Sequence, residues 1–114
     1  MIKQYVVVLD GTPQNLLTAA AGASVPSVAG ATVDLACRAI WLSPRGTNNN
    51  PIYLGDSALL SNTNYGIRLE AGDINNLPPA PFTAGEFNAG PLKLSDFWVL
   101  GTATEILHVL MVPF

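Results

Sequence analysis

Residues 66–70 alternate strictly between apolar and charged side chains after a glycine. Ile67 and Leu69 point to one side of an extended chain, while Arg68 and Glu70 point to the other. This period of two is typical of a β-strand with one face buried and one face in water. A chain with this pattern is expected to build its core from sheets, and the rest of the sequence agrees.

Short apolar runs rich in β-branched and aromatic residues recur along the chain, and Gly, Pro, Asn and Asp separate them. Six runs are predicted as strands: residues 5–9, 33–42, 52–54, 67–70, 94–101 and 105–112. Residues 14–17 are an additional candidate strand. No internal repeat is evident. We therefore predict one all-β domain over residues 1–114, a β-sandwich or jelly-roll-like barrel of about seven or eight short strands.

The segment 18–32 is rich in alanine and glycine and has two interpretations. Alanine favours helix, but Gly22, Pro26 and Gly30 interrupt any helical period. We favour an extended loop of small residues, and a short helix is the alternative. Small side chains let two backbones approach closely, so this loop is also a candidate contact with a neighbouring subunit.

A second long segment, 77–91, is expected to be irregular, because its prolines would remove hydrogen-bond donors from a central strand. A loop of this length is usually functional or makes contacts. Aromatic residues on strands usually belong to the core, whereas those on loops are available to partners. The predicted partner-binding residues lie on predicted loops: Pro78, Pro79, Phe82, Phe87 and Tyr65.

The composition suggests that partners cover part of the surface, because 49% of residues are apolar and only 11% are charged, against a usual value of about 25%. In the run 33–42, Ile40 and Leu42 should share one side and Cys37, Ala39 and Trp41 the other. A strand that is apolar on both faces is expected to be buried twice, and residues 105–112 have the same character. Both runs favour a homo-oligomer.

Several partner classes are disfavoured. A net charge of −3 with five Lys and Arg residues cannot neutralise many phosphates, so no nucleic-acid partner is expected. No apolar run approaches the length of a membrane span, and no signal peptide is recognised at the start. We expect a protein that is made in a cytoplasm and stays soluble.

The residues for catalysis are sparse. His108 is the single histidine and Cys37 the single cysteine, so a two-histidine metal site and an internal disulfide are impossible. We expect a buried, inert thiol at Cys37 and a structural or interface role for His108. The aspartates beside turn residues, Asp10, Asp56, Asp73 and Asp96, are predicted to bond nearby backbone N–H groups; a calcium site is the alternative, although no EF-hand spacing is present. No enzyme activity and no cofactor are predicted.

Four segments resemble, in matching order, pieces of small β-sandwich virion proteins of tailed bacteriophages: residues 35–42, 51–57 (PIYLGDS), 64–73 (NYGIRLEAGD) and 94–103 (LSDFWVLGTA). The first 34 residues and the segment 77–91 depart from this pattern. The resemblance implies a non-enzymatic capsid decoration (cement) protein, a trimer located on the virion and bound to the major capsid protein. The alternatives are a carbohydrate-binding or fibre module that uses Tyr65, Phe82 or Trp98, and a tail or head–tail connector component.

Overall fold

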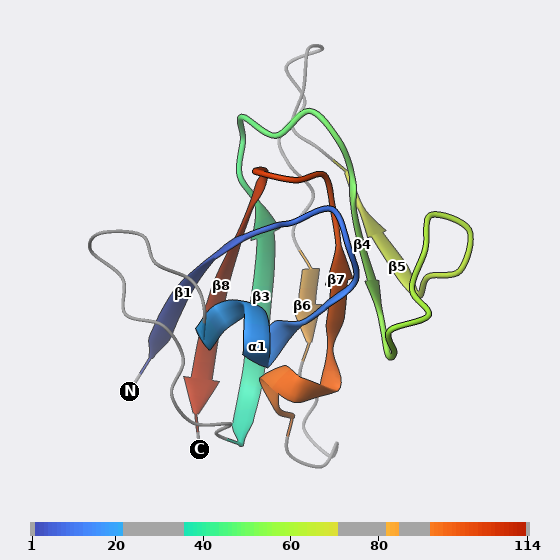
Figure 1. Ribbon diagram of the computed structural model, residues 1–114. Helices are drawn as coiled ribbons and strands as arrows, with labels where there is room; N and C mark the ends of the chain where they lie inside the picture. Colours follow the sequence, from blue (N-terminus) through green and yellow to red (C-terminus); the bar gives the residue numbers. More distant parts are fainter. Residues whose placement is uncertain (1, 22–35, 71–81, 85–91, 114) are drawn as a thin grey trace.

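The computed structural model describes residues 2–21, 36–70, 82–84 and 92–113, and the elements below lie within them (Figure 1). Eight strands among these residues form two four-stranded sheets with antiparallel pairing. Both sheets contribute to one apolar cluster, so the chain is an all-β sandwich, as its alternating pattern predicts.

The first sheet, sheet A, has the order β1-β8-β3-β6. Its strands are β1 (Lys3–Val8), β8 (Ile106–Pro113), β3 (Cys37–Pro44) and β6 (Phe82–Ala84). Strands far apart in the sequence are paired here, and β8 lies between β1 and β3 (Figure 1). Since β8 is central, its apolar character has a structural reason: every second side chain faces the core.

The second sheet, sheet B, has the order β2-β7-β4-β5. Its strands are β2 (Gln14–Asn15), β7 (Trp98–Leu100), β4 (Ile52–Gly55) and β5 (Ile67–Leu69). Three of the four segments that carry the resemblance, 51–57, 64–73 and 94–103, supply β4, β5 and β7. These segments are therefore neighbours in space, because they supply three of the four strands of sheet B.

Residues 18–21 are helical and not extended, so the prediction of a loop over 18–32 is wrong at its start. Helix α1 (Leu16–Ala21) begins after Asn15, whose Oδ1 accepts the Leu17 N–H at 3.1 Å. This bond caps the first turn, and Leu16 and Ala20 are fully buried against the core. The remainder of segment 18–32 lies outside the described residues.

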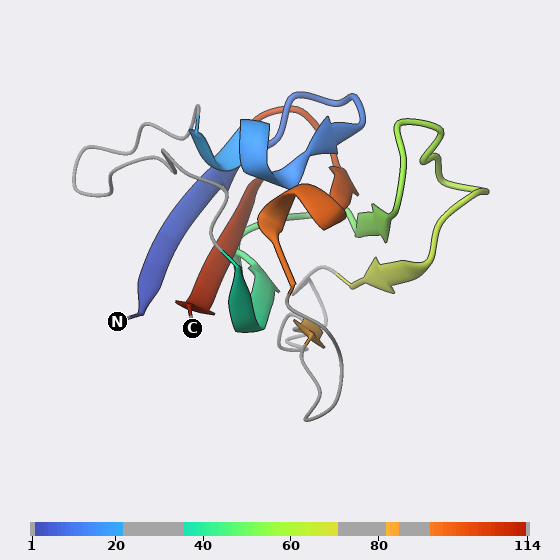
Figure 2. The same ribbon diagram turned by 90° about the horizontal axis from the view of Figure 1, so that it is seen from below.

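The 3-10 helix η1 (Leu94–Asp96) replaces the beginning of the strand predicted over 94–101. Its Leu94 is buried, and η1 lies beside α1 on the side of sheet A that faces sheet B (Figure 2). The two short helices therefore close one end of the core. On the opposite face of sheet A, Figure 2 shows no strand or helix among the described residues.

The segment 77–91 also contains a strand, which the sequence did not predict. Backbone pairing places Phe82 opposite Leu42 and Ala84 opposite Ile40, so β6 extends sheet A at its β3 edge. The three prolines that argued for a loop all precede this strand in the sequence. The rest of the segment lies outside the described residues.

A β-bulge changes which face of β3 carries Cys37. The register shifts between Cys37 and Ala39, and the extra residue turns Cys37 to the same, buried side as Ile40. The expectation that Cys37 shares a face with Ala39 and Trp41 is therefore wrong. The expectation that its thiol is buried is confirmed, since Cys37 is completely inaccessible and its Sγ lies 3.1 Å from the carbonyl oxygen of Leu92.

Candidate functional site

The β4–β5 loop is held in shape by its own hydrogen bonds. Ser61 Oγ accepts the N–H of Asn64 at 3.0 Å, and Asn64 Nδ2 donates to the carbonyl of Leu59 at 3.0 Å. The Gly66 N–H donates to the carbonyl of Leu54 at 2.8 Å and returns the chain to the sheet. Because these bonds form within the folded chain, the loop presents one arrangement to a partner.

Gly55 fixes the loop against β4 through a close approach. A Cβ at this position would lie 2.9 Å from Leu60 Cδ1, nearer than real Cβ atoms come to a neighbour. Leu60 itself is 5% exposed. The glycine therefore lets Leu60 fold down on the end of β4, which anchors the loop to the sheet.

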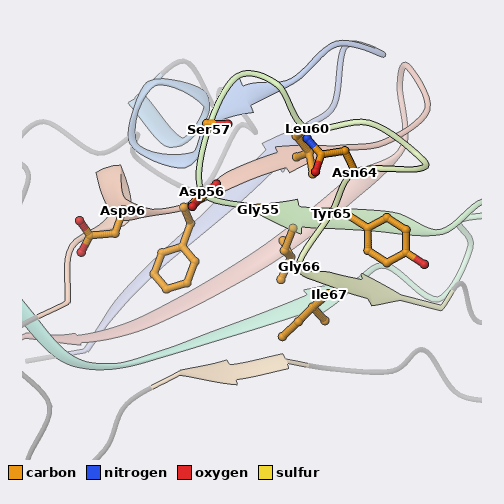
Figure 3. A pocket seen from close by; sticks show the side chains of 11 residues that line it. Gly55, Asp56, Ser57, Leu60, Asn64, Tyr65, Gly66, Ile67 and Asp96 are labelled. Atoms are coloured by element: carbon orange, nitrogen blue, oxygen red, sulfur yellow. The ribbon is translucent and has the colours of Figure 1, made fainter.

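A pocket of about 440 Å³ opens at this end of the sandwich (Figure 3). It is lined by the end of β4, the β4–β5 loop, the start of β5 and the η1–β7 junction: Leu54, Gly55, Asp56, Ser57, Leu60, Asn64, Tyr65, Gly66, Ile67, Asp96 and Phe97. We call it the hairpin pocket. Its volume lies within the usual range of about 300–1,000 Å³ for small-ligand sites.

The hairpin pocket is acidic. Asp56 and Asp96 lie toward one end and Tyr65 toward the other (Figure 3). Asp96 Oδ2 accepts the Lys93 N–H at 2.8 Å, which agrees with the predicted turn role. Among the described residues neither carboxylate forms an ion pair, and no lysine, arginine or histidine belongs to the lining. An uncompensated negative charge therefore lies at the pocket.

Exposed apolar side chains gather beside the hairpin pocket. Leu59 is 78% exposed, Tyr65 44% and Ile67 38%. The Tyr65 ring contacts the Tyr53 ring at a centroid distance of 4.9 Å, and the Arg68 guanidinium lies 5.9 Å from the Tyr53 centroid. Tyrosine and arginine are the residue types enriched at interface hot spots, where leucine is under-represented.

A second unusual surface is the outer face of sheet A. The ten outward positions of β1, β8 and β3 that keep the regular register carry no Asp, Glu, Lys or Arg: Gln4, Val6, Val8, Ala39, Trp41, Ser43, Ile106, His108, Leu110 and Val112. Two arginines border them, because the exposed Arg38 stands at the bulge of β3 and Arg45 follows β3 and contacts His108. Val8 is 45% and Trp41 41% exposed. Most outward side chains are half-buried or buried, and no described strand or helix covers this face. Covering of the second face of residues 33–42 and 105–112 by a partner stays a prediction.

His108 lies on this outer face and is hydrogen-bonded to a cation. Arg45 Nε donates to His108 Nε2 at 3.1 Å. Partial burial of the ring, and then the positive charge of Arg45, lower the pKa of His108 below its ordinary value. A neutral imidazole that accepts from arginine is a structural arrangement, in line with the role expected for it.

The predicted site residues have different outcomes. Tyr65 lines the hairpin pocket and is exposed. Phe82 begins β6 and does not lie on a loop, which corrects the prediction for its backbone. Pro78, Pro79 and Phe87 lie outside the described residues. No local pattern marks Asp56, Asp96 and Phe97 as one site, because the pairing of β4 with β7 brings these distant segments together.

The aspartate turn prediction is also confirmed at Asp10, whose Oδ1 accepts the N–H of Thr12 at 2.9 Å and its hydroxyl at 2.7 Å. These bonds lower the pKa of Asp10. Asp73 lies outside the described residues. Within the described part of the chain, no three His, Cys, Asp or Glu residues gather as a metal site would require, and no helix is long and apolar enough to cross a membrane.

Comparison of the chain with known proteins finds no match. No family model matches it, and neither the curated proteins nor the solved structures contain a match.

Proposed function

We propose that this protein is a non-enzymatic structural component of a tailed-phage virion, a capsid decoration protein that binds the lattice of the major capsid protein as a homo-oligomer. The largely apolar outer face of sheet A is the observation that carries the proposal. An antiparallel sheet that faces water normally alternates apolar and polar side chains, with its polar face outward. The ten regular outward positions of β1, β8 and β3, all without a charge, instead favour contact with protein, while Arg38 at the bulge and Arg45 after β3 border them.

The resemblance of the four segments supports the same function. Three of them contain β4, β5 and β7, and residues of all three segments line the hairpin pocket. A subunit that faces copies of itself on one side and a lattice on another needs little charged surface. The charged fraction of 11% fits this arrangement.

The test is co-sedimentation of the purified protein with capsids assembled without it. We expect saturable binding to the capsid fraction and a higher resistance of the loaded capsids to heat. An unrelated protein lattice serves as the control for non-specific pelleting. Absence from the capsid pellet at every protein concentration would sink the proposal.

A carbohydrate-binding or fibre module is the second candidate. It is favoured by Tyr65, an exposed ring in the lining of the hairpin pocket, to which Ser57 and Asn64 add a hydroxyl and an amide. Binding to host-cell surface glycans without binding to capsids would favour this candidate over the first.

A further inference from the structure

We propose that the hairpin pocket binds an arginine or lysine side chain that a partner protein presents next to an apolar residue. The proposal deepens the proposed function, on which it rests for the identity of the partner as the capsid lattice. The chemistry of the pocket, in contrast, is argued from this chain alone.

Charge selects the ligand. Asp56 and Asp96 are both exposed and belong to the lining, and no basic residue balances them there. Each ionised carboxylate has about four lone-pair sites, and the backbone of Lys93 accounts for one at Asp96. An anionic ligand would be repelled, whereas a cationic side chain gains charge-assisted hydrogen bonds.

The walls of the pocket suit the rest of such a side chain. Phe97 and Tyr65 supply aromatic rings, and Leu54 and Ile67 supply aliphatic surface. A guanidinium or ammonium group is attracted to an aromatic face, and its methylene stem packs on apolar atoms. A bare metal ion fits poorly, because no group of three potential ligands gathers among the described residues.

The surroundings extend the contact beyond one side chain. Ile67 in the lining and Leu59, next in sequence to the lining residue Leu60, are 38% and 78% exposed, so they offer apolar surface to a neighbour of the basic residue. The hydrogen bonds of Asn64 and the packing of Leu60 on Gly55 hold the loop before binding. A preorganised loop loses little entropy on binding, which raises affinity.

The experiment is a titration of the isotope-labelled protein with N-acetyl-arginine methylamide, followed by amide NMR shifts. The matched ligand is N-acetyl-citrulline methylamide, which has almost the same shape without the charge. We expect shifts centred on Gly55, Asp56, Gly66 and Phe97 with the arginine compound, weakening as salt is added. The citrulline compound should cause much smaller shifts.

The variant Asp56→Asn should weaken arginine binding about threefold to fivefold, the value of one exposed ion pair. Asp10→Asn, which removes the same charge from a turn outside the pocket, should leave binding unchanged. The dispersed spectrum of each variant reports that it is folded.

Equal binding of arginine and citrulline, shifts located elsewhere, or an unchanged affinity in Asp56→Asn would overturn the proposal. So would shifts at the pocket with glucose or galactose but not with arginine, an outcome that favours the glycan module. Arginine binding without co-sedimentation would refute the decoration function alone. Co-sedimentation without arginine binding would refute the pocket alone.

Discussion

The Arg45–His108 hydrogen bond makes one histidine sensitive to pH. On the outer face of sheet A, the ring of His108 stands opposite Val6 of β1 and Ser43 of β3, and Arg45 is the charged group that contacts it. Protonation would turn the acceptor nitrogen into a donor and place two positive charges together. The folded state therefore favours the neutral ring.

Because the pKa of His108 is lowered on folding, the unfolded chain binds more protons near its ordinary value of 6.5. The stability from this residue is present above that value and is lost as the pH falls through the lower, folded value. We expect the free energy of unfolding in urea to fall between about pH 7.5 and about pH 5. His108→Gln should flatten this slope, while Asp10→Asn should not; an identical slope in His108→Gln would contradict the assignment.

Asn48 is a buried polar residue with a structural role. It is 4% exposed, its Nδ2 donates to the carbonyl of Ile106 at 2.7 Å, and its Oδ1 accepts the Ile106 N–H at 3.1 Å. The Ile106 N–H thus depends on this side chain, while the Ile106 carbonyl also accepts the Arg45 N–H at 3.0 Å. The loop that contains Asn48 is therefore anchored to the start of β8.

Replacing Asn48 with Ala should lower the free energy of unfolding by about 1–3 kcal/mol, because the Ile106 N–H loses its partner and the Ile106 carbonyl loses one of its two donors. Asn49→Ala is the control, since Asn49 is exposed, and its effect should stay within about 0.5 kcal/mol. Urea denaturation measures both. Equal effects of the two substitutions would show that the Asn48 bonds contribute nothing specific.

The end of β7 depends on a glycine that lets the two sheets meet. A Cβ on Gly101 would overlap the side chain of Leu9 and lie 3.4 Å from Ile52 Cγ1. Leu9 and Ile52 are buried, so neither can move aside without disturbing the core. The position is a packing constraint on how the chain leaves β7 for β8.

We therefore expect Gly101→Ala to destabilise the fold by about 1–3 kcal/mol through overpacking. The matched control is Gly46→Ala, where an added Cβ meets no atom within 4 Å. Thermal unfolding of both variants tests the difference. A melting temperature for Gly101→Ala equal to that of Gly46→Ala would show that the core accommodates the methyl group.

At the level of the molecule, the largely apolar outer face of sheet A predicts self-association. Light scattering should give a mass above the 12.0 kDa of one chain, with a trimer as the expected state. Trp41→Glu should shift the protein toward the monomer, because burying an unpaired carboxylate in an apolar interface is costly. Thr47→Glu adds the same charge at an exposed loop position and should not. A wild-type protein that stays monomeric at micromolar concentration would refute this prediction.

The strands over residues 52–54 and 105–112 could be predicted because their signal is local. Alternation and turn residues act within a few positions, and the structure has β4 and β8 there. The first turn of α1 and strand β6 were missed for a tertiary reason. Burial of Leu16 and Ala20 supports a short alanine-rich helix, and pairing with β3 gives the three residues of β6 their strand conformation.

The all-β class follows from the sequence, because a period of two and frequent turn residues are properties of neighbouring positions. The face that carries Cys37, the pairing of β4 with β7 and the composition of the hairpin pocket do not follow from it. Asp56 and Asp96 are brought to one pocket by register between strands that are distant along the chain. Register depends on the combined packing of both sheets, which no local pattern encodes.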